Sequence, residues 1–485
     1  MLNVLTSEKV RSAEEETMRR GVDVMFLRFN AALAVADGIY ERARGKNTRT
    51  AVFCGSGGNG CDGILAAVRL FRKGCNVVVY LVGSAEKANA QALEYAKSEG
   101  VPVRPCSEFD GADIIIDAIF GIGLNRPIEG ETAELIEKLN GAENAFRLAV
   151  DIPSGLNADT GEVMGKAFKA HVTITFSCYK AGMLFGEGRE YCGKITVEDV
   201  GVKTESNVRV YENSDFAPFR RRRDAHKGNA GRVYIIGGCG SMIGAPVLAA
   251  TAAHAAHLNG AGTVTVCLPS VHRVAVSSRS AMSMMKFLSD TANGYIKFVK
   301  RELDDIIKRA DAIAIGMGMG AAPDLKRMIA YLCENFDGSL VIDADAINAL
   351  AGDYSILRGS KPEIVLTPHV GEFKRLTGLD PTIENAAKLA RDVGCLVALK
   401  SATTIITDGE ETRLNVTGTP AMAKGGMGDV LSGCITALSC AYPLFDAITV
   451  ACYRNGVGAE RAVSSFAEMM LTAHDVLNMA NYPEL

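Results

Sequence analysis

The residues best suited to phosphoryl chemistry lie near the C-terminus, in the stretch Gly425–Gly433. Its glycines offer backbone N–H donors at the start of a predicted helix, and such donors stabilise negative charge on a transferring phosphoryl group. Asp429 follows in the first turn, where a carboxylate can take the proton from an attacking hydroxyl. The helix dipole alone also favours an aspartate there. Glycine-rich loops after several other predicted strands tilt the balance toward phosphoryl transfer.

Three further motifs of the C-terminal half follow predicted strands. Gly316–Gly320 and Lys400–Thr404 are small-residue loops, and His369 follows a Thr-Pro pair. His369 could bind a substrate or could simply form a turn, and its place at a strand end favours the first. His254 and His257 stand three apart in an alanine-rich segment. No carboxylate or cysteine completes a metal site near them, so packing is favoured.

The N-terminal half carries polar side chains at the ends of three predicted strands. The first strand leads into a glycine-rich loop with Asn59 and Asp62, which suits an anion or a tight turn. This loop matches neither a Walker A motif nor a clean dinucleotide fingerprint. Asp117 ends the second strand, and Asp151 and Ser154 follow the third. Such hard oxygen ligands suit an alkali or alkaline-earth cation, although each aspartate alone could cap a helix.

Regular elements must bring these residues together. Apolar β-rich runs alternate with helical patterns in both halves, which predicts two α/β domains with mostly parallel sheets. Ligands bind beyond the carboxyl ends of such strands. We expect a hairpin around Asp408-Gly409. The expected strands are 50–54, 76–82, 113–118, 148–152, 172–176, 232–236, 263–268, 312–315, 340–342, 364–366 and 396–399, with helices at 64–73 and 85–99.

A polar, charge-rich stretch separates the two halves. It contains Pro218 and the run Arg220–Arg223, which we interpret as a solvated linker in preference to a nucleic-acid patch. The expected organisation is therefore an N-terminal domain at 1–212, a linker at 213–224 and a C-terminal domain at 225–485.

Composition excludes several classes of function. The net charge of −4 argues against nucleic acid as a main partner, because phosphate binding needs a basic surface. No uncharged apolar run is long enough for a transmembrane helix, and the N-terminus lacks a signal-peptide core. The 13 cysteines form no CxxC pair. They indicate reduced core thiols in a cytoplasmic protein, without zinc or disulfides.

The N-terminal motifs resemble the epimerase domain of the bifunctional NAD(P)H-hydrate repair enzymes. The resemblance rests on the loop at 59–62, the Asp-Ala-x-Phe-Gly-x-Gly-Leu-x-Arg-Pro stretch at 117–127 and the Asp-x-Pro-Ser-Gly stretch at 151–155. It implies a Rossmann-like three-layer domain that interconverts the R and S epimers of hydrated NADH or NADPH.

The resemblance also implies roles for individual residues. Asp151 would contact the hydrated nicotinamide and serve as the acid–base group. Asn59, Asp117 and Ser154 would hold potassium. The hydrated nucleotide would be lined by Gly58, Asn59, Gly60, Cys61, Asp62, Gly121, Ile122, Gly123, Leu124, Asn125, Arg126, Pro127 and Asp151. Departures from the family pattern are Gly58 in place of Asn, Cys61 in place of Gly, and Arg28-Phe29 in place of Met-Glu.

The C-terminal motifs resemble the dehydratase domain of the same family, which is ribokinase-like. The resemblance rests on 242–245, 367–372, 400–404 and 425–433. It implies ADP-dependent dehydration of the S epimer, with magnesium on the nucleotide phosphates: the hydroxyl is phosphorylated and phosphate is then eliminated. The implied site residues are Ala245, Gly318, His369 and the catalytic Asp429 for hydrated NAD(P)H, and Lys400, Ser401, Ala402, Thr403, Thr404 and Gly428 for ADP.

The two resemblances together predict a metabolite repair enzyme whose partners are hydrated NADH or NADPH and ADP, with neither nucleic acid nor membrane. They also suggest a homo-oligomer. The alternative is a ribokinase-type small-molecule kinase with a stable phosphate ester as product. Its N-terminal domain would only bind nucleotide or scaffold an assembly. The order of the motifs favours repair.

Overall fold

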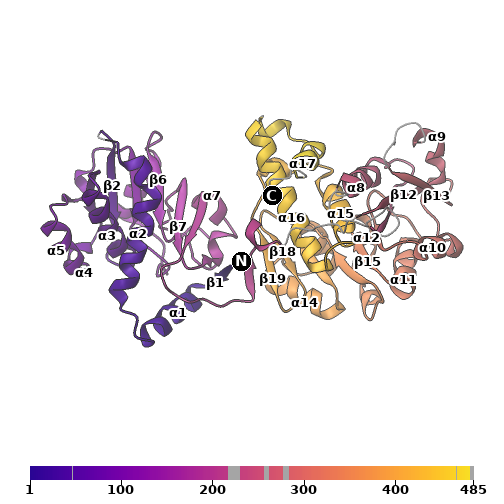
Figure 1. Ribbon diagram of the computed structural model, residues 1–485, viewed down its shortest axis with the longest axis horizontal. Helices are drawn as coiled ribbons and strands as arrows, with labels where there is room; N and C mark the ends of the chain where they lie inside the picture. Colours follow the sequence, from indigo (N-terminus) through magenta and orange to yellow (C-terminus); the bar gives the residue numbers. More distant parts are fainter. Residues whose placement is uncertain (46, 217–229, 256–260, 277–282, 466, 481–485) are drawn as a thin grey trace. The chain divides into compact units, whose positions relative to one another are not determined.

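The chain forms two compact units in a computed structural model, the first spanning Leu2–Val208 and the second Arg209–Leu485 (Figure 1). The structure describes the chain except residues 46, 217–229, 256–260, 277–282, 466 and 481–485. Most of the predicted linker, including Arg220–Arg223, lies outside the described residues, as does His257. The predicted domain boundaries at 212 and 225 therefore stay predictions.

The first unit is built on a parallel sheet. Each pair of neighbouring strands runs parallel, which confirms the predicted α/β class. In sheet order the strands are β4 (Val103–Pro105), β3 (Asn76–Leu81), β2 (Arg49–Cys54), β5 (Ile114–Ala118), β6 (Phe146–Val150), β7 (Val172–Phe176) and β9 (Lys194–Glu198). A short strand, β1 (Leu2–Leu5), pairs parallel with β8 (Tyr179–Lys180).

Strand alternation divides the core of the first unit into two halves. Val52 and Cys54 face one cluster with α2, α3 and α5, whereas Ala51 and Phe53 face another with α6. Helices thus cover both faces of the sheet, as expected for parallel strands. The helices are α1 (Ser7–Arg19), α2 (Val24–Ala43), α3 (Gly58–Arg72), α4 (Ala85–Ala88), α5 (Ala90–Ser98), α6 (Gly130–Asn140) and α7 (Gly188–Cys192).

Three predicted boundaries in the first unit were wrong. The helix expected at 64–73 begins at Gly58, so the predicted binding loop forms its first turn. The helix expected at 85–99 is interrupted at Asn89, whose Nδ2 donates a hydrogen bond to Gly55 O at 2.9 Å. The strand expected at 148–152 ends at Val150, because Asp151 has φ = +64°. A left-handed residue cannot continue a strand.

The second unit has a mixed sheet that is mostly parallel. Strands are parallel as far as β17 and antiparallel after it, and the predicted hairpin is confirmed. In sheet order they are β13 (Met284–Leu288), β12 (Thr263–Pro269), β11 (Arg232–Ile236), β14 (Ala312–Ile315), β15 (Ser339–Ile342), β16 (Glu363–Leu366), β17 (Leu396–Leu399), β18 (Thr404–Thr407) and β19 (Thr412–Asn415). A further short strand is β10 (Val208–Val210).

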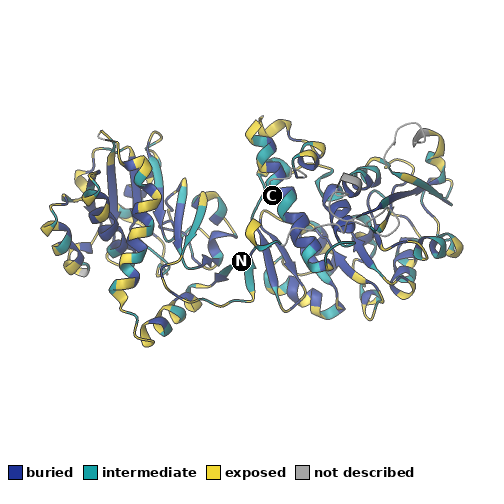
Figure 2. Cartoon of the chain, in the orientation of Figure 1, coloured by how far each residue is buried: buried dark blue, intermediate teal, exposed yellow. Residues whose placement is uncertain are grey.

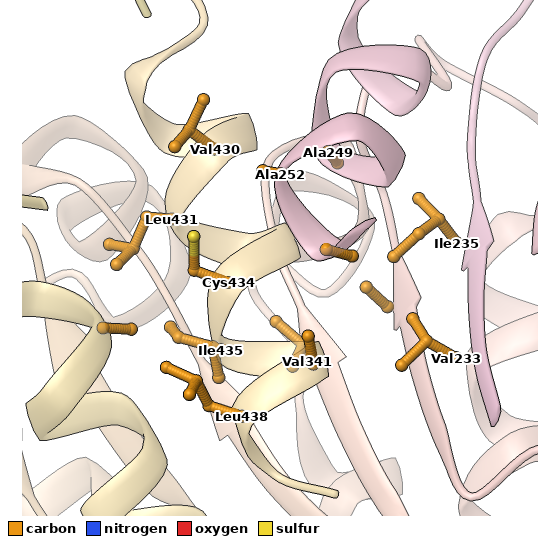
Figure 3. Close-up of a cluster of buried hydrophobic side chains, with 14 of the residues drawn as sticks. Val233, Ile235, Ala249, Ala252, Val341, Val430, Leu431, Cys434, Ile435 and Leu438 are labelled. Atoms are coloured by element: carbon orange, nitrogen blue, oxygen red, sulfur yellow. The ribbon is translucent and has the colours of Figure 1, made fainter. Parts of the chain in front are cut away.

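Helices α8, α15 and α16 pack on one face of this sheet (Figure 3). The alternate side chains Ile313 and Ile315 are also fully buried, so both faces are covered (Figure 2). The helices are α8 (Gly244–Ala255), α9 (Arg273–Val276), α10 (Lys300–Ile307), α11 (Leu325–Asn335), α12 (Asp345–Ala349), α13 (Val370–Thr377), α14 (Ile383–Val393), α15 (Met427–Leu438), α16 (Leu444–Ser465) and α17 (Ala473–Ala480).

All 13 cysteines are free thiols, and most are buried. Among the described residues, no helix combines the length and apolarity needed to cross a bilayer.

We expect Gly433→Ala to destabilise the second unit. A Cβ at Gly433 would lie 2.1 Å from Ala249 O, because α15 and α8 approach most closely there. Such overpacking costs about 1–3 kcal/mol. Calorimetric unfolding of the full chain measures the effect. Gly244→Ala is the matched control, since a Cβ there meets nothing within 4 Å. Equal unfolding temperatures for both variants would contradict the prediction.

Candidate active sites

The three residues expected to hold potassium lie together around the backbone of Phe120. Asn59 Nδ2 donates a hydrogen bond to Phe120 O at 3.0 Å, and Phe120 N–H donates to Ser154 Oγ at 2.8 Å. Ser154 binds Asp117 through its Oγ at 2.6 Å and its N–H at 2.7 Å. Three segments far apart in the sequence thus converge beyond the ends of β2, β5 and β6.

This cluster fits a hard monovalent cation. Asn59 is 8% exposed, and its Oδ1 is buried with no hydrogen-bond partner among the described residues. An unpaired buried carbonyl oxygen is costly unless a ligand completes it. Burial raises the pKa of Asp117 to about 6 against the hydrogen bonds from Ser154, so a nearby cation would favour its charged form. Oxygen donors of this kind suit potassium.

Arg28 of α2 lies against the first turn of α3. Its Nη1 donates to Asp62 Oδ2 at 2.9 Å, and a Cβ at Gly58 would lie 2.2 Å from its Nη2. The family departures at positions 28 and 58 thus lie in contact, since a side chain at position 58 would displace the guanidinium of Arg28 from its present place. Burial raises the pKa of Asp62 to about 7 against the opposing charge of Arg28. Cys61, which directly precedes Asp62 in the chain, is half-buried.

Asp151 stands immediately beyond β6 in the left-handed region. Its backbone N–H donates to Ile174 O at 2.7 Å, which holds the residue against β7. Its carboxylate forms an ion pair with Lys180, a side chain that is 1% exposed. A non-glycine residue at positive φ costs about 1–3 kcal/mol and persists only where the surroundings enforce it. The fold therefore aims this carboxylate at a fixed place.

The loop expected to line the hydrated nucleotide runs from Gly121 to Pro127. Gly121 lies beside Asn59, since its Cβ would be 3.4 Å from the asparagine Cβ. Arg11 Nη2 donates to Ile122 O at 3.1 Å. Positions 123 and 125–127 are exposed, whereas Leu124 is half-buried. The loop thus begins beside Asn59, one of the three residues expected to hold potassium, and its later residues are exposed to solvent.

Lys400 and Asp343 form the buried ion pair of the second unit. Lys400 Nζ lies 2.9 Å from Asp343 Oδ1, and Ser432 Oγ donates to Asp343 Oδ2 at 2.7 Å. Asp343 is 2% exposed. Burial raises its pKa, but Lys400 and the hydrogen bonds outweigh burial and hold the pKa below its ordinary value. The carboxylate therefore stays charged and fixes the lysine.

Asp429 and Gly428 lie at the start of α15, next to this pair. A Cβ at Gly428 would lie 3.4 Å from Lys400 Nζ, so the glycine backbone borders the ammonium group. Gly426 begins the helix at φ = +93°. Burial, followed by the charge of Asp343, raises the pKa of Asp429 to about 6 against Lys400. A carboxyl group with such a pKa can exchange a proton near neutral pH.

The loop that follows Lys400 is held by local hydrogen bonds. Ser401 Oγ donates to Thr403 O at 2.5 Å, and Thr404 Oγ1 donates to Ser401 O at 3.5 Å. Thr403 is buried, and Ser401 and Ala402 are exposed. Ser401 and Ala402 are therefore accessible to a ligand.

His369 caps helix α13 and also neighbours the lysine. Its Nδ1 accepts a hydrogen bond from Gly371 N–H at 2.9 Å, and its backbone N–H donates to Glu372 Oε2 at 2.8 Å. A β-bridge joins His369 to Lys400. His369 thus forms a turn at the start of α13, which is one of the two roles that the sequence allowed. Because Nδ1 accepts a hydrogen bond, Nε2 is the ring nitrogen that carries a hydrogen, and it lies 3.5 Å from Glu372 Oε1.

Ala245 and Gly318 lie side by side. A Cβ at Gly318 would stand 3.4 Å from the Ala245 Cβ. Gly320, in the same loop, donates its N–H to Asp345 Oδ2 at 2.7 Å. A pocket of about 480 Å³ opens there, lined by Gly320, Ala321, Ala322, Pro323, Lys326, Asp345, Asn348 and Ala349.

Family models match both units. The model described as the YjeF-related protein N-terminus matches residues 26–182, and the NAD(P)H-hydrate dehydratase model matches residues 233–480. A bifunctional NAD(P)H-hydrate repair enzyme from Moorella thermoacetica is 34% identical, covering 93% of this chain and 91% of that protein. The chain belongs to the family of bifunctional NAD(P)H-hydrate repair enzymes. The predicted family and the predicted fold class, two α/β domains with mostly parallel sheets, are thereby confirmed.

Other members of the repair-enzyme family come from distant organisms. The enzyme of Pyrobaculum aerophilum is 33% identical over 98% of this chain and 96% of its own length. That of Coxiella burnetii is 32% identical over 97% of both. Among solved structures, an ADP/ATP-dependent NAD(P)H-hydrate dehydratase from Bacillus subtilis, co-crystallised with ATP and Mg²⁺, gives a TM-score of 0.46 at 24% identity. It covers 54% of this chain and 92% of that one.

Sequence reasoning missed three charged residues of these sites: Lys180, Arg28 as a partner of Asp62, and Asp343. Asp343 carried a usable signal, because it directly follows an apolar strand, as Asp151 does. Lys180 lies in a two-residue strand and carried none.

We expect the free energy of unfolding of the Asp62→Asn variant, relative to that of wild type, to increase as pH rises from about 4.5 to about 7. The folded protein holds a proton on Asp62 that the unfolded chain has lost over this range. Wild-type stability therefore falls with pH, by at most about 1.4 kcal/mol per unit for one group. Thermal unfolding at several pH values measures this.

Asp110→Asn is the matched control, since Asp110 is 70% exposed and pairs with Arg49 on the surface. A pH trend of the same size in both variants would refute the assignment to Asp62.

Proposed function

We propose that the first unit interconverts the R and S epimers of hydrated NADH and NADPH, and that the second unit dehydrates the S epimer with ADP. One observation carries this proposal. Each unit holds a candidate acid–base aspartate next to a buried lysine, Asp151 beside Lys180 and Asp429 beside Lys400, within segments that match the family models. Hydration yields both epimers, so the first reaction feeds the second.

In the first unit, Asp151 takes a proton from the hydrated nicotinamide and returns it. The loop residues 58–62 and 121–127 bind the rest of the nucleotide. Asn59, Asp117 and Ser154 are proposed to hold potassium, and the unpaired Oδ1 of Asn59 supports this. The ion would supply a fixed positive charge that ties three strand ends together. Removal of potassium from the buffer would then weaken the contacts that hold Asn59, Asp117 and Ser154 together.

In the second unit, Asp429 accepts the proton of the substrate hydroxyl as its oxygen attacks the terminal phosphoryl group of ADP. Lys400 and the Gly428 backbone stabilise the charge that develops on that group. AMP leaves, and loss of phosphate together with a proton from the neighbouring ring carbon then restores the double bond of the dihydronicotinamide. Mg²⁺ bound to the ADP phosphates would neutralise part of their negative charge. His369 donates a hydrogen bond to hydrated NAD(P)H, and the small residues Ala245 and Gly318 leave space for this substrate.

The assembly and the compartment are further parts of the proposal. Helix α2 exposes the apolar side chains of Val24, Phe26, Phe29 and Leu33, a surface that a second copy of the chain could cover. Free buried thiols fit the reducing cytoplasm. We therefore propose a cytoplasmic homo-oligomer.

We expect Asp151→Asn to slow epimerisation by a factor of about 10²–10⁴, the range for loss of an acid–base group. Asparagine tolerates φ = +64°, so the backbone is preserved. The assay supplies the pure R epimer without ADP and follows the S epimer by chromatography. Asp37→Asn, on the surface, is the control. Equal conversion in variant and wild type would leave the first unit as a binding domain only.

We expect Asp429→Asn to abolish dehydration and to spare epimerisation. In the wild type, kcat/KM for dehydration should fall below about pH 6, because the base works only when ionised. The assay follows recovery of dihydronicotinamide absorbance from the S epimer with ADP and Mg²⁺. Asp392→Asn, on the surface, is the control. Formation of a stable phosphate ester from a sugar or vitamin alcohol, without recovery of NADH, would instead identify a kinase.

A further inference from the structure

Lys180 is 1% exposed, lower than any other lysine or arginine in the described part of the chain. It lies in β8, whose register with β1 pairs Lys180 with Leu5. A buried ammonium group is costly unless it is paired and fully hydrogen-bonded. The groups that accept hydrogen bonds from Lys180 therefore indicate its role.

The ammonium group has three N–H donors, and the structure gives it three acceptors. Nζ binds Asp151 Oδ1, Thr175 Oγ1 at 2.8 Å and Phe176 O at 3.2 Å. No donor is left for a substrate. Lys180 can therefore act on the reaction only through Asp151.

The Asp151 carboxylate is held through one oxygen. Oδ1 accepts from Lys180, from Thr175 Oγ1 at 3.2 Å and from Phe176 N–H at 3.4 Å. Oδ2 has no such partner among the described residues, and the side chain is 14% exposed. The carboxylate thus presents Oδ2 alone to the site.

Two other acidic side chains interact electrostatically with Asp151. Glu14 on α1 and Asp62 on α3 both have pKa values raised by burial and further by the charge of Asp151. Arg28 offsets part of this charge but is engaged by Asp62. Lys180 is the cation in direct contact with the carboxylate.

We propose that Lys180 is the positioning residue of the epimerase site, holding Asp151 ionised with Oδ2 toward the hydrated nicotinamide. This inference rests on the proposed function of the first unit. Oδ2 then takes up and returns the substrate proton while Oδ1 stays tied to the ammonium group. Lys180 touches no substrate.

The test compares Lys180→Met and Lys180→Arg with wild type in the full chain, using conversion of the R to the S epimer without ADP from about pH 5 to about pH 9. For Lys180→Met we expect kcat at neutral pH to fall about tenfold or more, KM to stay within about twofold, and the acidic limb to move up by about one unit. For Lys180→Arg we expect a lower kcat with the acidic limb unmoved, because the charge remains.

Lys169→Met is the matched control, since it breaks an exposed ion pair with Glu190 in the same unit. An unmoved acidic limb in Lys180→Met, or a loss confined to KM, would overturn the inference. If Lys180→Met does not fold, Lys180→Arg decides, and a shifted limb in that variant overturns it. Wild-type protein that converts no R epimer would instead refute the proposed function itself.

Discussion

In both units the chain turns sharply as it leaves the carboxyl end of a parallel strand, and a buried lysine meets an aspartate at that turn. After β6 the turn is made by Asp151 at φ = +64°, and after β15 by Ala344 at φ = +51°, next to Asp343. Neither residue is glycine, so surrounding contacts enforce the backbone. The same constraint thus aims a carboxylate at each site, and the glycine loops are arranged around it.

The class of each domain and the polar residues at its strand ends could be predicted from local patterns. Short apolar, β-rich runs located the strands, and parallel strands share one functional edge. That argument placed Asn59, Asp117 and Ser154 together, and the structure does bring them around Phe120. Helix starts were less predictable, because Gly58 and Gly60 are typical of a loop although they lie in the first turn of α3.

The charged partners could not be predicted in the same way. Lys180 reaches Asp151 from 29 positions away in a strand of two residues, too short for any period to register. Arg28 reaches Asp62 across 34 positions, and its guanidinium lies over Gly58, which has no side chain. Such pairs depend on tertiary packing, and no local preference encodes them.

Stability alone does not account for these buried ion pairs. Replacing a buried ion pair by apolar residues of similar volume is often neutral or stabilising, because desolvation of two charges offsets their attraction. The chain nevertheless keeps Lys180 with Asp151 and Lys400 with Asp343, both at strand ends that face a site. Asp151 is bonded through Oδ1 and leaves Oδ2 without a partner among the described residues, and Lys400 is bonded to Asp343 and borders the Gly428 backbone. A pair arranged in this asymmetric way fixes a charge in one direction, which a proton or a phosphoryl group in transfer requires.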